Sequence, residues 1–307
     1  MVYLPTPQQL RYLVTLAETG HFSRAAASCA VSQSTLSAGI LALERQLDAA
    51  ILDRSAAKHA VFTPLGLELV AKARTALNAL ATLAEAADAA RAPMTGPLRL
   101  GIIPTIGPFL LPRLMPALRE AYPALKLFLR EDQTERLLDQ LEAGHLDALI
   151  LAEPCACGGA ETLAVLRDEF LVALPKGHPL AARESVAIAA LAAEPFLLLE
   201  EGHCLRDQVL STCGSGVGRT SEFAATSLHT LIQMVAGGLG LTLVPRLAVL
   251  AGITQGADVD LRRLEGAGGW RSIALAWRPN SPHAAEYRAL APLIVSAGSG
   301  AISNLML

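Results

Sequence analysis

The stretch FSRAAASCAVSQSTLSAGILALE, residues 22–44, predicts two helices joined by a tight turn. A short helix begins at Ser23, the chain turns at Val31, and a longer helix follows. The apolar positions of the longer helix recur at i, i+4, i+7 and i+11 and form one inward stripe: Leu36, Ile40, Leu43 and Leu47. Small polar residues lead this helix and face outward, namely Ser32, Gln33, Thr35 and Ser37.

Such a pair of helices is typical of a helix-turn-helix DNA reader, and a plain three-helix bundle is the alternative. Glutamine can bond adenine through two hydrogen bonds, and serine or threonine can contact bases or phosphates. Charge does not decide, because residues 1–63 hold five Lys or Arg against four Asp or Glu, a net +1 that predicts only weak phosphate binding. Residues 51–66 then predict a small hairpin wing, with Arg54 and Lys58 as candidate DNA-backbone contacts.

Two more helices are predicted on either side of this segment. In TPQQL, Thr6, Pro7 and Gln9 complete a capping box and begin a helix that Gly20 ends. The long alanine-rich stretch 64–91 keeps a 3,4 apolar spacing at Val70, Ala73, Leu77, Leu80, Ala84 and Ala87. This seam either packs within its own domain or joins a second copy of the helix. Beside a DNA reader it favours a dimer that binds two half-sites in double-stranded DNA.

Beyond a linker at residues 91–97, strands and helices alternate as βαβαβ with near-continuous apolar strands, which predicts a parallel sheet. A second run follows, and its size implies two small α/β lobes. We therefore expect a DNA-binding domain at 1–63, a linker or dimerisation helix at 64–92 and a regulatory domain at 93–307. Within the last, the expected lobe I spans about 97–168 plus 271–307, and lobe II spans about 169–270.

Composition sets the class and the compartment. With 52 % hydrophobic and 17 % charged residues, the chain of 307 residues fits a soluble globular protein. The most apolar window, 98–118, contains two arginines and several prolines and is not a membrane span. No signal peptide is predicted at the start, so we expect a cytoplasmic protein with reduced thiols. Five cysteines, an odd number, then argue against a structural disulfide framework.

Several segments of the chain resemble the sequence pattern of one protein family. Residues 10–66, with FSRAAASCAVSQSTLSAGILALE and a final FTPLG, resemble the winged helix-turn-helix of LysR-type transcriptional regulators. The segments GHLDALIL and MVAGGLGLTLVP are similar to the effector domain of that family, so the resemblance covers nearly the whole chain. Within the family, the heptapeptide GHCLRDQ and the eight residues between Cys204 and Cys213 resemble the peroxide-sensing members.

The resemblance implies a fold and an assembly. The fold would be α/β, with an N-terminal winged helix-turn-helix, a long linker helix and a two-lobed Rossmann-like effector domain of the periplasmic-binding-protein type. The assembly would be a homotetramer built as a dimer of dimers. It implies no enzyme activity, no cofactor and no metal. RNA polymerase would be recruited at antioxidant genes. Two departures from the family pattern, Ser34 and a longer, less basic wing, leave the preferred DNA site open.

The resemblance also implies roles for individual residues. Cys204 would react with hydrogen peroxide, Cys213 would resolve the product into a disulfide, and a glutaredoxin- or thioredoxin-like reductant would reset it. The pocket or switch positions are Thr105, Thr134, His203, Asp207 and Arg278, and Arg206 is a further candidate cation. If residues 204–213 are helical, nine steps of about 1.5 Å separate the two Cα atoms by roughly 13 Å. A disulfide needs about 7 Å or less, so that helix would have to come apart.

Reaction with peroxide needs a thiolate, so the pKa of Cys204 should be lowered. The N-terminal end of a helix favours an anion there, whereas Glu200 and Glu201 oppose it. One rival is a LysR-type regulator that binds a small organic effector in its interlobe cleft, with silent cysteines; the rival from another class is a thiol peroxidase. Cys29 is expected to be structural. Cys155 and Cys157 are separated by one residue, too close for an easy disulfide, and lack two more clustered ligands for a metal.

Overall fold

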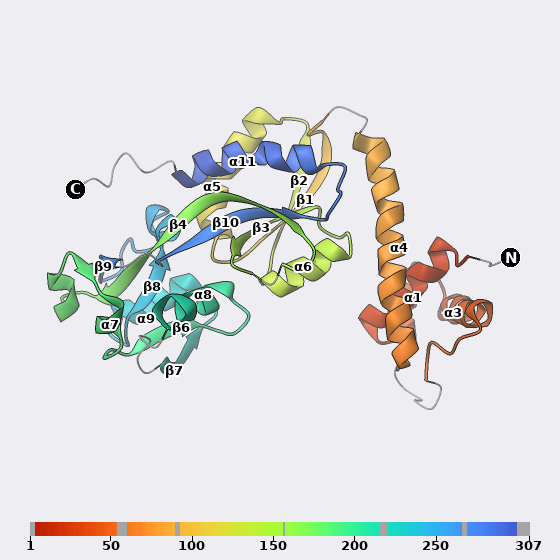
Figure 1. Ribbon diagram of the computed structural model, residues 1–307, viewed down its shortest axis with the longest axis horizontal. Helices are drawn as coiled ribbons and strands as arrows, with labels where there is room; N and C mark the ends of the chain where they lie inside the picture. Colours follow the sequence, from red (N-terminus) through yellow and green to blue (C-terminus); the bar gives the residue numbers. More distant parts are fainter. Residues whose placement is uncertain are drawn as a thin grey trace. The chain divides into compact units, whose positions relative to one another are not determined.

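The computed structural model describes residues 4–53, 60–89, 93–155, 157–214, 220–265 and 269–299 (Figure 1). The chain forms two compact units, Met1–Asp88 and Ala89–Leu307. Each unit has its own hydrophobic core. The two units are therefore described separately.

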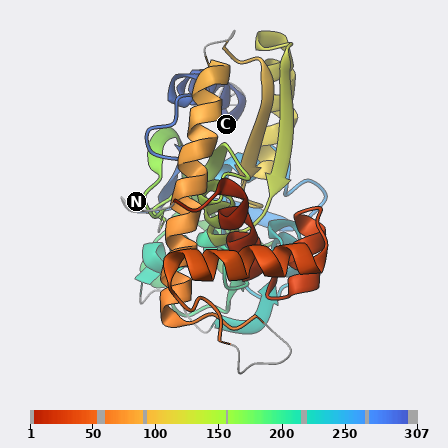
Figure 2. The ribbon, with the colours of Figure 1, turned by 90° about the vertical axis from the view of Figure 1, so that its right-hand side faces the viewer.

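The first unit begins with the predicted helices. Helix α1 (Pro7–Thr19) starts with the capping box, in which Gln9 N donates to Thr6 Oγ1 and Thr6 N donates to Gln9 Oε1, and Gly20 ends it in the left-handed conformation. Helices α2 (Phe22–Ser28) and α3 (Gln33–Leu47) follow, bent by 100° at the turn between them. Figure 2 views these helices in red to orange. The inward stripe is confirmed, since Leu36, Ile40 and Leu43 are buried and Leu47 packs against the same core.

The base of the predicted wing is present. Leu52 and Phe62 form an antiparallel bridge, and Asp53 N donates to Val61 O at 2.8 Å. Arg54 and Lys58, at its expected tip, lie outside the described residues.

Helix α4 (Pro64–Ala89) uses its apolar seam in two ways. Val70 and Ala73 are buried in the core of this unit, and Leu77 packs against that core. Leu80, one turn further, keeps 44 % of its surface exposed. The first part of the seam therefore packs within its own unit, and an apolar surface begins at Leu80.

The second unit begins with a βαβαβ run. Strand β1 (Gly96–Ile102) pairs in parallel with β2 (Leu125–Glu131) and β3 (Ala148–Glu153). The connections are α5 (Gly107–Ala121) and α6 (Thr134–Glu142). The prediction of a parallel sheet is correct for these three strands only. Strand β10 (Trp270–Trp277) lies antiparallel between β3 and β4 (Glu161–Pro175), so the full sheet is mixed.

Strand β4 connects the two halves of this unit because it is long enough to take part in both. Its first half pairs with β10, and its residues 170–175 pair antiparallel with β8 (Thr242–Pro245) and β9 (Val259–Leu264). A separate parallel pair joins β6 (Phe196–Leu199) to β7 (Thr220–Ala225). The remaining elements are η1 (Pro179–Ala182), β5 (Ser185–Val186), α7 (Ile188–Leu191), α8 (Cys204–Cys213), α9 (Leu228–Ala236), α10 (Arg246–Leu250) and α11 (Ala284–Ser299).

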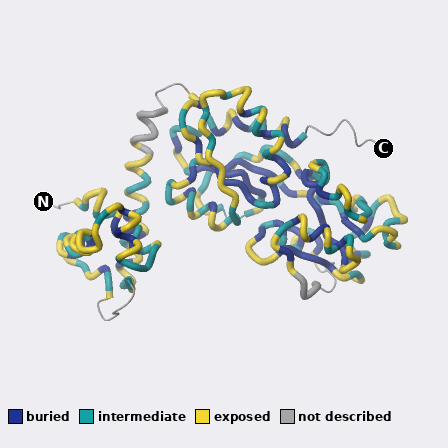
Figure 3. Tube along the Cα trace, turned by 180° about the vertical axis from the view of Figure 1, so that it is seen from behind, coloured by how far each residue is buried: buried dark blue, intermediate teal, exposed yellow. Residues whose placement is uncertain are grey.

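The core of the second unit follows the central strands. All of residues 148–152 and 273–277 are buried, and Figure 3 shows them among the dark-blue segments in the middle of the sheet. Helices α5 and α11 pack against each other on one face, and α6 packs against β3 on the other (Figure 1). Among the described residues no single helix is long and apolar enough to cross a membrane; α2 and α3 pass that test only as a bent pair.

Candidate functional site

The start of α3 presents the predicted DNA-reading residues to solvent. Ser32, Gln33, Thr35 and Ser37 are all exposed. Ser32 Oγ caps the helix by accepting from Thr35 N at 3.1 Å, and it also lies 2.8 Å from the hydroxyls of Ser34 and Thr35. The Ser32 hydroxyl therefore orders the helix start. Contact of Gln33 and Ser37 with bases stays a prediction, with which their exposure is consistent.

A second candidate site surrounds the start of α8. Cys204 is the first residue of this helix, and it follows Gly202, which has a φ of +90°. A Cβ at Gly202 would lie 2.7 Å from Oε1 of Gln133, the residue before α6. Glycine is required here both by the backbone and by this contact. The close approach brings the start of α8 against the start of α6.

Several influences of opposite sign act on the pKa of the Cys204 thiol. Burial is the largest, and it raises the pKa of Cys204 above its ordinary value even though the residue keeps part of its surface exposed. The Arg271 charge and a hydrogen bond from Thr134, the first residue of α6, lower that pKa, while Asp207 raises it. The sequence leaves this balance open, and in the structure dehydration of the sulfur outweighs the helix end and the nearby cation.

Arg271 is the functional candidate that sequence reasoning missed. This buried side chain in β10 donates from Nε to Asp168 Oδ2 at 3.0 Å. Its Nη1 donates to Thr105 Oγ1 and its Nη2 to Thr105 O, both at 2.9 Å. Asp168 Oδ1 in turn accepts from Leu247 N at 2.8 Å. These hydrogen bonds hold the Arg271 guanidinium in place and connect it to Thr105.

A signal for Arg271 exists in the sequence. Arginine begins the otherwise apolar strand RSIALAW, and a buried strand keeps a charge only when a partner satisfies it. That partner, Asp168, is distant in sequence and lies in β4, a strand whose first half was not predicted. The pairing therefore depends on a strand register that a single sequence does not reveal.

Two arginines predicted near Cys204 have other contacts. Arg206 Nη1 donates to Leu199 O at 3.0 Å. Arg278 Nη1 donates to Leu141 O and Leu146 O at 2.9 and 2.7 Å, beyond the far end of β10 from Arg271. Seven extended residues separate Arg278 from Arg271, a distance of about 23 Å. Arg271 is a cation whose charge acts on the Cys204 thiol, whereas a role of Arg278 in the switch stays a prediction.

His203 and Asp207 flank Cys204 on α8. His203 occupies the N-cap position and is only 8 % exposed. Burial lowers the pKa of His203, although Glu200 acts to raise it. A lowered pKa keeps this imidazole neutral near pH 7, so it supplies no positive charge to the thiol. Asp207 is exposed, and its negative charge opposes the thiolate at Cys204.

Cys213 is the last residue of α8 and is 4 % exposed. Burial raises the pKa of its thiol to about 11, so this sulfur is protonated and unreactive in the intact helix. Because α8 is continuous between the two cysteines, their Cα atoms are roughly 13 Å apart. Gly214 follows α8 with a φ of +50°. Two further glycines, at residues 216 and 218, lie outside the described residues.

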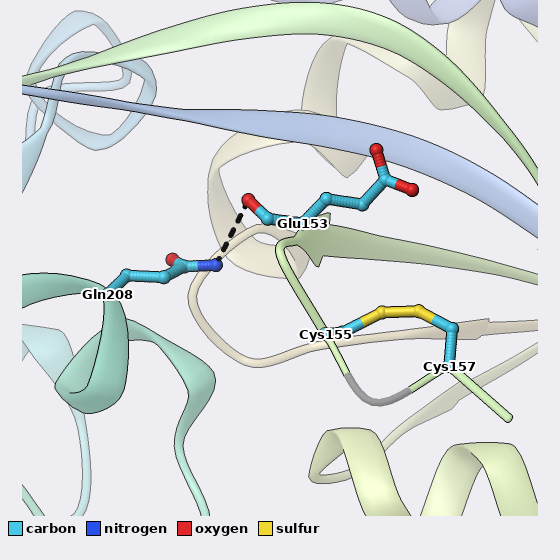
Figure 4. The surroundings of a disulfide bond; sticks show 4 residues. All are labelled: Glu153, Cys155, Cys157 and Gln208. Atoms are coloured by element: carbon cyan, nitrogen blue, oxygen red, sulfur yellow. Dashed lines mark hydrogen bonds between the residues drawn. A yellow bond between two sulfur atoms is a disulfide. The ribbon is translucent and has the colours of Figure 1, made fainter. Parts of the chain in front are cut away.

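The sequence leaves the role of Cys155 and Cys157 open. The two residues follow β3, with their Cα atoms 5.2 Å apart and their sulfur atoms adjacent (Figure 4). In the part of the chain that the structure describes, no group of three or more His, Cys, Asp or Glu side chains can hold a metal ion.

Comparison with family models assigns both units to one family. Residues 7–67 match the bacterial regulatory helix-turn-helix protein, lysR family, and residues 91–298 match the LysR substrate binding domain. Between the two matches lie residues 68–90, which include most of α4.

Individual proteins give the same result. The chain is 43 % identical over 288 residues to the DNA-binding transcriptional dual regulator OxyR of Escherichia coli K12, covering 94 % of each chain. It superposes on a cysteine-to-aspartate variant of full-length OxyR from Pseudomonas aeruginosa with a TM-score of 0.74 and 37 % identity, covering 95 % of this chain and 98 % of the other. A cysteine mutant of Corynebacterium glutamicum OxyR with hydrogen peroxide bound gives 0.67 and 34 %, covering 99 % and 95 %.

Proposed function

Because the chain belongs to the LysR family of bacterial transcriptional regulators, we propose that it is a DNA-binding sensor of hydrogen peroxide, similar in function to OxyR. One observation carries the proposal: Cys204 and Cys213 occupy the two ends of one helix. Cys204 is hydrogen-bonded to Thr134, and the charge of Arg271 lowers the pKa of its thiol. The relatives named above support it, since one was solved with hydrogen peroxide bound. The protein would act in the cytoplasm, where thiols are reduced at rest.

The first chemical step is oxidation of Cys204. Its thiolate attacks one peroxide oxygen, the O–O bond breaks, and the sulfur becomes a sulfenic acid. The other oxygen leaves as hydroxide and becomes water with the proton that the thiol gave up. Arg271 stabilises the thiolate and the developing hydroxide by its charge. Since Thr105 Oγ1 accepts from Arg271, its own proton can be donated to a bound peroxide.

The second step joins the two cysteines. Cys213 attacks the sulfenic sulfur of Cys204, a disulfide forms, and the hydroxyl leaves as water. The sulfurs cannot meet across an intact α8, so the helix must unwind first. Unwinding also exposes Cys213 to water, which lets its pKa fall from about 11 toward the ordinary thiol value and makes it nucleophilic. A slow thiol in the helix thus becomes reactive only after the helix has opened.

The disulfide changes the protein through α8. Leu205 and Val209 on this helix are buried in the core of the second unit, so unwinding forces the core around them to repack. In a tetramer of two dimers, this repacking would alter the spacing of the DNA-binding units on their half-sites and the recruitment of RNA polymerase. A glutaredoxin- or thioredoxin-like dithiol would reduce the bond and reset the protein.

A DNA footprint of a promoter site with and without peroxide tests the proposal. We expect the footprint of the wild-type protein to change on oxidation, and that of Cys204→Ser to stay in the reduced form at equal affinity. Cys29→Ala, which removes a thiol from the first unit, should respond like the wild type. A footprint of Cys204→Ser that still changes with peroxide would contradict the proposal.

A further inference from the structure

The outward face of α3 is defined by the core beneath this helix. Leu36, Ile40 and Leu43 are buried in that core. Successive residues of an α-helix are rotated by about 100°, and Ala38 is two residues from both Leu36 and Ile40, so its side chain points about 160° away from each of them. Ala38 is exposed. It therefore lies in the middle of the surface by which α3 faces away from its own unit.

Packing against α1 holds α3 in one rotation about its axis. A Cβ at Gly39 would lie 2.7 Å from Cδ2 of Tyr12, so the backbone of α3 passes directly over the ring of this buried residue. The Tyr12 hydroxyl accepts a hydrogen bond from Gln8 Nε2 at 2.7 Å, which holds the ring in turn. Because α3 cannot rotate over this ring without a clash, Ala38 keeps its place in the middle of the outward face.

Three of the four hydroxyl groups in residues 32–37 bind one another. Ser32 Oγ accepts from Thr35 N and lies 2.8 Å from both Ser34 Oγ and Thr35 Oγ1. A hydroxyl has one proton and two lone pairs, so Ser32 donates to one of these hydroxyls and accepts from the other. Residues 33–43 contain no Lys, Arg, Asp or Glu. The outward face of this part of α3 is therefore uncharged, and apolar contact is available to it at Ala38.

We propose that Ala38 recognises thymine in the major groove of DNA, by contact of its methyl group with the C5-methyl group of the base. Residues 7–67 match a regulatory helix-turn-helix, and the second helix of such a motif lies in the major groove with its N-terminal part against the base edges. Ala38 is in the second turn of α3. Thymine is the only base that presents a methyl group in that groove, and alanine is among the side chains that contact it. Ala38 is thus a specificity-determining residue, independent of the proposed response to peroxide.

Uracil substitution tests this contact, because uracil differs from thymine only in lacking the C5-methyl group. A duplex is selected from a random pool by the full-length reduced protein, and each of its thymines is then replaced singly by uracil. We expect replacement at one position of the bound sequence to weaken binding about fourfold in fluorescence anisotropy, the factor that burial of about one methyl group supplies. Ala38→Gly should bind the thymine and uracil duplexes equally at that position.

Ala27→Gly is the matched control. Ala27 is exposed on α2, so this change has the same cost in helix propensity and leaves α3 intact. The control should keep the fourfold preference for thymine. Each ratio compares two duplexes bound by one protein, so a loss of folded protein affects both affinities equally and cancels. A wild-type protein that binds every uracil duplex as tightly as the original, or a thymine preference that persists in Ala38→Gly, would overturn the proposal.

Discussion

At the residue scale, Arg271 and Asp168 are the most deeply buried charged residues in the described part of the chain. Arg271 donates hydrogen bonds from Nε, Nη1 and Nη2 to Asp168 and Thr105. Removing one partner of a buried ion pair leaves an uncompensated charge, which costs about 3–5 kcal/mol. We therefore expect Arg271→Met to lower the free energy of unfolding of the second unit by that amount, measured by urea denaturation.

The matched control for Arg271→Met removes the orphaned charge as well. Asp168→Asn with Arg271→Met should recover part of the lost stability, because no unpaired carboxylate remains buried. Oxidation of Cys204 should stay slow in this double variant, since the cation is still absent. If the double variant were as unstable as the single one, the assignment of Asp168 as the main partner would be wrong.

The raised pKa of Cys204 predicts how oxidation depends on pH. Burial favours the neutral thiol, so the thiolate is a minor species at pH 7 and increases about tenfold for each pH unit below the pKa. We expect the rate constant for loss of the Cys204 thiol with peroxide to rise throughout pH 6–8.5 without a plateau. The measurement is alkylation-quenched mass spectrometry in a Cys213→Ser protein. A plateau below pH 7 would show that the pKa is lowered instead.

The role of a residue could be predicted from the sequence where it depends on neighbouring residues in the chain. It could not be predicted where it depends on the register and order of the strands. The capping box at Thr6 and the exposed start of α3 follow from adjacent residues. The thiol environment does not, because Arg271 reaches Cys204 through a sheet order that the sequence leaves open. The contacts of Arg278, beyond the opposite end of β10, depend on the same sheet order.

At the element scale, the contact between the starts of α6 and α8 depends on Gly202. A side chain at this position would clash with Gln133. The backbone would also keep a φ of +90°, which is unfavourable for any residue with a Cβ. We expect Gly202→Ala to destabilise the start of α8 by about 1–3 kcal/mol and to speed disulfide formation between Cys204 and Cys213. Hydrogen exchange of residues 203–207 measures the first effect. Unchanged protection there would contradict it.

Most elements could be predicted from periodicity, and the exceptions have physical causes. The helices α1, α3 and α6 have 3.6-residue apolar stripes, and α1 and α3 also have N-cap hydrogen bonds. The second half of β4 is a clear apolar run, whereas its first half ends in three charged residues, 167–169, and is mostly half-buried or exposed. The antiparallel insertion of β10 was missed because strand order depends on contacts between distant segments.

At the scale of the whole molecule, α4 predicts how copies associate. Its seam is buried as far as Ala73 and partly at Leu77, and it becomes exposed at Leu80. An apolar surface on a long helix favours a second copy. We expect Leu80→Lys to weaken self-association at least tenfold in sedimentation equilibrium without unfolding the first unit. Lys72, already on α4, gives the matched control: Lys72→Gln should leave the dimer unchanged.

The domain organisation follows from the sequence more securely than the switch does. The composition shift near residue 91 lies close to the observed division after Asp88. A switch, in contrast, requires two arrangements of one segment, and a sequence pattern describes only the arrangement that its local preferences favour. In the proposed switch the continuous helix α8 is the reduced arrangement, and a disulfide between its two cysteines would require a second one.

The most direct test of the account is the disulfide map of the full-length protein after brief treatment with a small excess of peroxide. Non-reducing peptide mass spectrometry should find the peptide of Cys204 joined to that of Cys213, in proportion to the peroxide consumed. Cys204 as an uncombined sulfenic acid with Cys213 still free, or Cys204 joined to Cys155 or Cys157, would contradict the proposed switch.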